Sequence, residues 1–228
     1  MSFPLPAAAS AAAFLLALVG VPLAARAQNP CASYVTTPSL GSWGEYQATK
    51  DGQPSVTMRF AVVGQERRGG RILQRFETSL RGISAAGQME EMIMQVLVPG
   101  YPYEPESIEE VVVKGQGKPA MRMSPATMAQ LKAQMKASGQ LSMADQCKGM
   151  AVVGDESLKV PAGTFRVRHF RDARTHNEIW MSRALPFGMV KTKDDKGVAL
   201  VLVGHGRGAR SAIVEAPVPM PVPVPPPR

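Results

Sequence analysis

The chain has little of what most catalytic sites are built from. It holds two cysteines, three histidines and only 6% aromatic residues among its 228 positions. It contains no Gly-x-Ser-x-Gly, His-Glu-x-x-His, phosphate-binding loop or dinucleotide fingerprint. Its paired carboxylates, at positions 90–91 and 109–110, are adjacent residues that point to opposite faces of a strand. Because no nucleophile, base and orienting group can be named together, we expect no enzymatic activity and no cofactor.

The chain also lacks an apolar run long enough to span a bilayer. Its longest such run, Ala7–Val21, is shorter than the roughly 20 residues of a spanning helix. The small-x-small site Ala25-Arg26-Ala27 follows it, as in a secretory signal. We therefore expect residues 1–27 to be a cleaved signal peptide and the mature protein to lie in the periplasm. An uncleaved membrane anchor is the alternative. Lipidation of Cys31 is not expected, because Pro30 stands where a small residue is needed.

Two cysteines in an exported protein are most simply one disulfide. The bridge would join Cys31 to Cys147, and the chain-entropy model gives it on the order of 4–5 kcal/mol. Two unpaired thiols, or a copper or zinc pair, are the alternatives. A cysteine pair without a nearby histidine cluster is a poor metal site.

The charge balance is basic. The net charge of +8 falls to +7 when the signal segment, whose one charged residue is Arg26, is removed. A basic exported protein meets anionic lipid head groups, so we expect an anionic membrane surface as a possible partner and no nucleic acid. Solubility explains the charge equally well.

Residues 28–215 are long enough for one domain. After Cys31 the chain alternates apolar and polar residues in short runs broken by turn residues, a pattern typical of an antiparallel sheet. We expect roughly eight to ten strands from this pattern. The nine clearest runs are Ser42–Lys50, Ser55–Val63, Ile72–Leu80, Gln88–Val98, Met150–Val160, Gly163–Phe170, Asn177–Ser182, Phe187–Lys193 and Val198–Val203. Glu106–Val113 is either helical or extended.

One helix is expected between the two groups of strands, over Ser124–Gly139. Ser124 suits the N-cap, Pro125 the first helical position and Gly139 the C′ position. A narrow apolar stripe at i, i+3 and i+7 consists of Met128, Leu131 and Met135.

Proline alternates with other residues in the last segment, 216–228. Proline fixes φ and cannot donate to a ladder, so we expect this segment to be an extended, solvated and disordered tail.

Methionine is abundant, with 14 residues in the chain. The two main clusters are Met89, Met92 and Met94, and Met121, Met123, Met128 and Met135. Flexible thioethers line adaptable apolar pockets, whereas Met-x-x-Met and Met-x-Met spacings bind Cu(I). Against copper, neither cluster contains a histidine or cysteine. An ordinary core is the third interpretation.

Three segments carry a family resemblance. They are Val160-Pro161-Ala162-Gly163-Thr164-Phe165, Glu178-Ile179-Trp180-Met181-Ser182 and Pro186-Phe187-Gly188-Met189-Val190-Lys191. In this order they resemble two hairpins of uncharacterised bacterial envelope proteins, which we group with the LolA/LolB-like lipoprotein carriers and related domains of unknown function. The resemblance covers about Ser42–Ile213. It implies a mainly β (α+β) fold, a curved antiparallel sheet or incomplete β-barrel with one or two helices covering the concave face.

The resemblance implies a soluble periplasmic binding protein for a lipid, an acyl chain or a lipoprotein, with the helix as part of a lid. A basic strand face with Arg166 and Arg168 would meet anionic head groups. The alternatives are a structural or interaction protein of the cell envelope and a Met-rich copper-handling protein. The residues expected to line the cavity or core are Phe60, Phe76, Met92, Met94, Met128, Leu131 and Met135.

Overall fold

The structure is a computed structural model that describes residues 31–50, 53–83, 88–137, 147 and 149–221. The expected signal peptide, Gly139 and the last part of the expected tail lie outside these residues. All statements below concern the described part of the chain.

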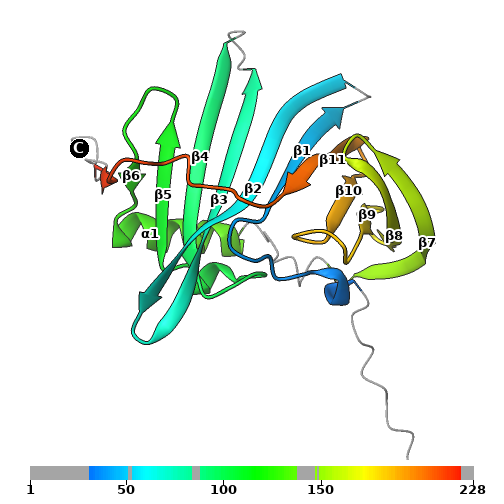
Figure 1. The fold of residues 1–228 in the computed structure, drawn as a ribbon, viewed down its shortest axis with the longest axis horizontal. Coiled ribbons are helices and arrows are strands. Elements are labelled where there is room, and N and C mark those ends of the chain that lie inside the picture. Colours follow the sequence, from blue (N-terminus) through cyan, green and yellow to red (C-terminus); the bar gives the residue numbers. More distant parts are fainter. Residues whose placement is uncertain (1–30, 51–52, 84–87, 138–146, 148, 222–228) are drawn as a thin grey trace, which may run out of the picture.

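Twelve strands form one open, curved sheet that does not close into a barrel (Figure 1). Their order in the sheet is β12-β6-β5-β4-β3-β2-β1-β11-β10-β9-β8-β7, and every pair is antiparallel except β12 with β6. The strands are β1 (Trp43–Lys50), β2 (Gln53–Arg68), β3 (Arg71–Ile83), β4 (Met89–Val98), β5 (Glu110–Gly115), β6 (Met121–Arg122), β7 (Met150–Val160), β8 (Gly163–Asp172), β9 (Glu178–Met181), β10 (Met189–Lys193), β11 (Val198–Gly206) and β12 (Val218–Pro219). The mainly β fold class is confirmed, with an open sheet in place of the incomplete barrel.

One α-helix, α1 (Pro125–Ala137), stands between the two groups of strands, as expected. Two short 3₁₀ helices, η1 (Ala32–Tyr34) and η2 (Pro105–Ser107), complete the regular structure. The ambiguous segment Glu106–Val113 divides between η2 and β5. All nine expected strand runs are found. The second runs on to Arg68, because a register shift between Val62 and Gly64 lets the strand continue past the glycine.

The interior consists of two main clusters. The C-terminal cluster packs the first part of the chain against β8–β11; its large members are Tyr46, Phe170, Ile179, Trp180, Met181 and Leu202. The N-terminal cluster packs α1 against β2–β5; its buried members are Val62, Phe76, Val96, Val98, Ile108, Val111 and Phe187. Phe60 packs against both clusters and therefore lies where they meet.

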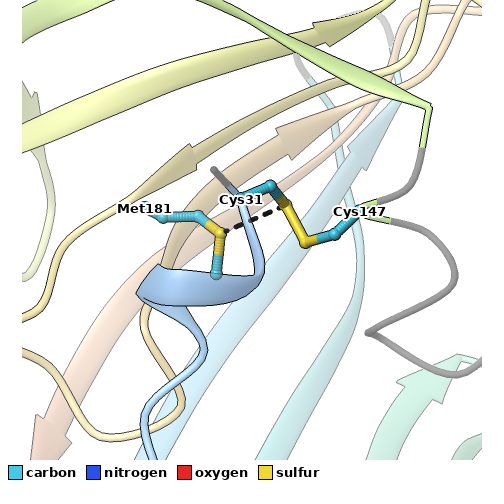
Figure 2. The surroundings of a disulfide bond; sticks show 3 residues. All are labelled: Cys31, Cys147 and Met181. Carbon is cyan, nitrogen blue, oxygen red and sulfur yellow. Dashed lines mark hydrogen bonds between the residues drawn. A yellow bond between two sulfur atoms is a disulfide. The ribbon is translucent and has the colours of Figure 1, made fainter. Parts of the chain in front are cut away.

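The disulfide between Cys31 and Cys147 is present, as expected (Figure 2). Its two Cα atoms are 5.2 Å apart and both residues are buried. The Sδ of Met181 lies 3.9 Å from the Sγ of Cys31. A bonded sulfur carries no hydrogen, so this contact is packing. The bridge fastens η1 into the C-terminal cluster.

The turn before β10 shows why glycine stands at position 188. Phe187 and Gly188 both have positive φ angles, 64° and 76°. A Cβ on Gly188 would overlap the carbonyl oxygen of Tyr34. The turn therefore depends on a residue without a side chain at the point where the N-terminal segment crosses it.

After β11 the chain crosses the sheet as an extended segment, residues 207–221, which we call the C-terminal strap. Figure 1 shows it, orange to red, running in front of β2–β5 to β6. Backbone bonds fix its two ends: Ala209 donates to Gly41, and Val218 to Ala120. Part of the segment expected to be a disordered tail is therefore strand β12. This part is extended and exposed, as expected, but it is paired, because alternate positions still carry the N–H groups of Val218 and Met220, which bond to the β6 segment.

Candidate functional site

Of the seven residues expected to line the cavity or core, Phe76 is a buried core residue and Phe60 packs against the core. The ring of Phe76 is 5% exposed and lies 5.7 Å from Tyr101 and 5.9 Å from Tyr103, centroid to centroid. Phe60 contacts the rings of Tyr46 and Phe187. These aromatic side chains fill the space between the two clusters.

Three more of the expected residues lie where α1 meets the sheet. Met94, Met128 and Leu131 are partly buried and pack against the N-terminal cluster. The helix begins as expected, since the Oγ of Ser124 accepts the N–H of Thr127 at 3.1 Å. However, no residue of α1 is fully buried. The helix is therefore a thinly packed cover over this face of the sheet.

The other two expected residues lie apart from this contact. Met92 is 49% exposed and lines a groove of about 660 Å³ at the open end of β3–β5, where Gly115 stands opposite it. Met135 is partly buried near the end of α1. Met92 and Met128 thus line two different grooves.

The buried tyrosines are not acid–base groups at neutral pH. Burial raises the pKa of Tyr101, with a smaller contribution from Tyr103, and burial also raises the pKa of Tyr103. Burial likewise raises the pKa of Tyr46, whose hydroxyl donates to the carbonyl oxygen of Met189 at 3.1 Å. All three phenols stay protonated and serve the packing.

A larger groove, of about 700 Å³, lies over the other half of the sheet and was not expected from the sequence. Strand register shows how its floor is built. Leu200 of β11 stands opposite Ala48 of β1 on one side and Thr192 of β10 on the other. Thr192 in turn stands opposite Ile179 of β9. The four side chains form one row across four strands, and the small ones leave the space. We call this space the cross-strand groove.

Two turns form the walls of the cross-strand groove. On one side, the carboxylate of Asp172 accepts the backbone N–H groups of Arg174 and Thr175 at 2.7 and 2.9 Å. These bonds, from Thr175 first, lower the pKa of Asp172. On the other side, Asp194 accepts the N–H groups of Lys196 and Val198. Both carboxylates are thereby committed to their turns.

The rim of the cross-strand groove carries two exposed cations. Arg174 and Lys193 line it together with the carboxylates of Asp172, Glu178 and Asp194. An apolar floor with cations at the rim can hold a ligand with an apolar chain and an anionic head. The sequence signals the strands that carry these residues, but only their register brings Ala48, Thr192 and Ile179 into one row.

His169 belongs to a separate stack on β8–β10. Its ring lies 4.2 Å from that of Trp180 at an interplanar angle of 12°, and Nε2 is 2.7 Å from a Glu178 carboxylate oxygen. The indole N–H of Trp180 donates to Glu156 at 2.6 Å, and the ammonium of Lys191 lies over the indole. The ring is thus held by stacking, whereas its buried Nε2 makes no hydrogen bond of good geometry with any described residue. The backbone N–H of His176 donates to the carbonyl oxygen of Asp172.

Arg168, expected to present charge to a membrane, is engaged within the protein. It donates two bonds of 2.6 Å to Asp155 and lies over the ring of Tyr34. Arg166 is exposed on the same strand. The basic face is thus partly neutralised by Asp155.

Among the described residues, no three or more His, Cys, Asp or Glu side chains come together as a metal site. The described part of the chain likewise contains no helix with the length and hydropathy of a membrane span.

No protein-family model matches the chain, and no curated protein matches it. Solved structures with a similar fold include a provisionally assigned lipoprotein from Parabacteroides distasonis, with 12% identity and a TM-score of 0.34 over 74% of this chain and 96% of that one. A provisionally assigned exported protein with a YmcC-like fold, from Bacteroides fragilis, has 10% identity and a TM-score of 0.35 over 75% and 97%. MucB has 13% identity and a TM-score of 0.33 over 80% and 60%. These likenesses are too distant to assign a family or a ligand.

Proposed function

We propose that this protein is a non-catalytic binding protein of the bacterial periplasm, a carrier or sensor for a lipid, an acyl chain or the acyl chains of a lipoprotein. The observation that carries the proposal is the cross-strand groove, which combines an apolar floor with a charged rim on which Arg174 and Lys193 are exposed. Its volume of about 700 Å³ lies in the range of small-molecule sites, about 300–1,000 Å³.

The disulfide supports export to an oxidising compartment. The Cys31–Cys147 bridge is buried and joins positions 116 residues apart. Disulfides persist in the periplasm and are rare in the cytosol. Together with the signal-like first 27 residues, the bridge favours a periplasmic protein.

The floor of the groove suits a flexible chain better than a rigid polar molecule. Met150, Ile179, Val198 and Leu200 line it with aliphatic or thioether groups, which adapt to an occupant without a fixed shape. Lys193 and Arg174 stand at the rim, where a carboxylate or phosphate head would remain partly hydrated. In this proposal the chain lies along the row and the head meets the cations.

The thinly packed α1 is a second place where an apolar chain can enter. Met123 and Met128 line a groove of about 410 Å³ between α1 and β5–β6. Elements with few buried contacts open at a lower free energy than the core. Movement of α1 would expose Met94 and the N-terminal cluster, in keeping with its expected role as part of a lid.

The first experiment is native mass spectrometry of the mature protein purified from its own periplasm, followed by lipid extraction. A co-purified acyl species supports the proposal and identifies the ligand. Bare protein that gains no mass after incubation with fatty acids or phospholipid vesicles contradicts it.

A filled groove tests the site itself. Ala48→Trp places an indole on the floor of the cross-strand groove, whereas Gln47→Trp places one on the opposite face of the same strand. We expect Ala48→Trp to weaken the binding of a fluorescent fatty acid at least about tenfold, which is a change of about 1.4 kcal/mol in the free energy of binding. We expect Gln47→Trp to leave this affinity unchanged. Equal binding by the two variants would assign the ligand to another place.

A structural or interaction role in the cell envelope is the second candidate. It is favoured by the aromatic packing of Phe76, Tyr101 and Phe187, which fills the interior of the N-terminal cluster. A protein that binds no lipid in the experiments above, yet is retained by cell-wall or envelope fractions, would support this role.

A further inference from the structure

An open sheet has two edges, and the backbone groups of an edge strand can recruit another strand. In this protein the edges are β7 and β12. At one of them the last pairing is short: Val218 and Pro219 of β12 stand opposite Met121 and Arg122 of β6. The edge strand beside β6 is therefore the chain's own C-terminal segment.

The spacing of proline gives β12 two different sides. The N–H groups of Val218 and Met220 donate to Ala120 and Arg122 at 2.9 and 2.8 Å. Successive N–H groups of an extended strand point to opposite sides, so the prolines at 217, 219 and 221 occupy the positions that face away from β6. Over residues 217–221 the outer side of the strand has carbonyl groups and no N–H donor.

The strap holds this segment in register. The N–H of Ala212 donates to the buried carboxylate of Glu77 at 3.0 Å, and the Lys114 ammonium pairs with Glu215 at 2.7 Å. Between them Ile213 packs with Ile93 and Val112. Contacts with β3, β4 and β5 thus position the strap beside β6 before the proline-alternating residues begin.

We propose that the proline-alternating segment is an edge terminator. Residues 216–221 of the same chain occupy the β6 edge. Their prolines prevent the strand of a second copy from adding to the outside of β12. This inference does not depend on what the protein binds.

The test gives the outer side its missing donors. The variant Pro217→Thr/Pro219→Thr/Pro221→Thr keeps the two inward N–H groups and adds three outward ones. We expect sedimentation velocity to show concentration-dependent self-association of this variant and a monomer for the unaltered protein. The matched control, Val218→Thr/Met220→Thr, adds threonines to the same strand without new N–H groups and is expected to stay monomeric.

Hydrogen exchange at the amides of residues 218 and 220 reports whether β12 stays paired. A triple variant that remains monomeric with these amides protected overturns the proposal, and so does a control that associates as strongly as the triple variant. Should the triple variant lose this protection, the single variant Pro219→Thr decides. Association with protected amides supports the proposal, and a monomer or unprotected amides overturn it.

Discussion

The buried carboxylate of Glu77, on β3, accepts the backbone N–H of Ala212 at 3.0 Å across 135 residues of sequence. The side chain of Glu77 is 2% exposed and also accepts a bond of 2.8 Å from the amide of Gln95. Gln95 in turn donates to Ser211 on the strap. The buried carboxylate of Glu77 therefore connects β3 to the C-terminal strap, which follows β11.

Replacing Glu77 by Ala removes the acceptor of the buried Gln95 amide and of the N–H of the exposed residue Ala212. Unpaired buried donors cost about 1–3 kcal/mol each, and partial rehydration moderates the sum. We expect a loss of about 2–4 kcal/mol in the free energy of urea unfolding and faster exchange of the strap amides. Glu91→Ala is the control, since Glu91 makes only an exposed pair with Arg81 and should change stability by less than about 1 kcal/mol.

Acid should weaken the sheet through Glu110. Burial disfavours the ionised form of Glu110 and by itself would raise the pKa. Hydrogen bonds from Arg75 and Arg68 and the charge of Arg122 outweigh burial, so the pKa of Glu110 is lowered. A carboxyl group whose pKa is lower in the folded state stabilises the protein above its unfolded pKa of about 4.5. That contribution is lost as the pH falls below this value and through the folded pKa.

The variant Glu110→Gln measures this contribution. We expect it to cost about 1–3 kcal/mol at pH 7, and its urea midpoint to fall less steeply than that of the unaltered protein below about pH 4.5. Glu109→Gln is the control, because its partner Arg71 is 65% exposed. Parallel acid limbs in Glu110→Gln and the unaltered protein would contradict the assignment.

Local signals in the sequence predict most of this fold, and long-range pairing explains what they miss. Alternation predicts strands such as β1 and β4, and Ser124 predicts the start of α1, because these depend on neighbouring residues. The strand β12 was missed because proline normally excludes a strand. Only the position of β6 beside it shows that Val218 and Met220 face a partner.

The candidate site divides in the same way. The apolar faces of β2–β4 place Phe60, Phe76 and Met94 correctly on the inner face, but periodicity does not tell a lining residue from a core residue. The cross-strand groove depends on Ala48 of β1 and on Thr192 and Ile179 of β10 and β9, which lie far from β1 in sequence. Their small or aliphatic side chains carry no signal until the register joins them.

Removing the disulfide should cost the protein a large part of its stability. The bond closes a loop of 116 residues, for which the chain-entropy model gives about 4–5 kcal/mol. We expect the variant Cys31→Ala/Cys147→Ala to lose about 2–5 kcal/mol in urea unfolding, as small exported domains do. Reduction of the unaltered protein should reproduce this loss and leave the double variant unchanged. A double variant as stable as the oxidised protein would show that the C-terminal cluster holds η1 without the bond.

Phe187 should couple the two halves of the sheet. Its ring belongs to the N-terminal cluster and contacts Phe60, Phe76 and Tyr101, although the residue lies just before β10 in the other half. Phe187→Ala removes these contacts and should cost about 3–5 kcal/mol, as truncation of a buried phenylalanine does. The positive φ of residue 187, unfavourable for any side chain, is not relieved by alanine. Unfolding followed separately by Trp180 in the C-terminal cluster and by a Tyr103→Trp probe in the N-terminal cluster, each as the single tryptophan, should coincide in the parent protein. In the Phe187→Ala variant the two transitions should separate, because the ring contacts that make the two clusters unfold cooperatively are lost. Coincident transitions in the variant would show that the continuous hydrogen bonding from β2 through β1 to β11 is sufficient to make the sheet unfold as one unit.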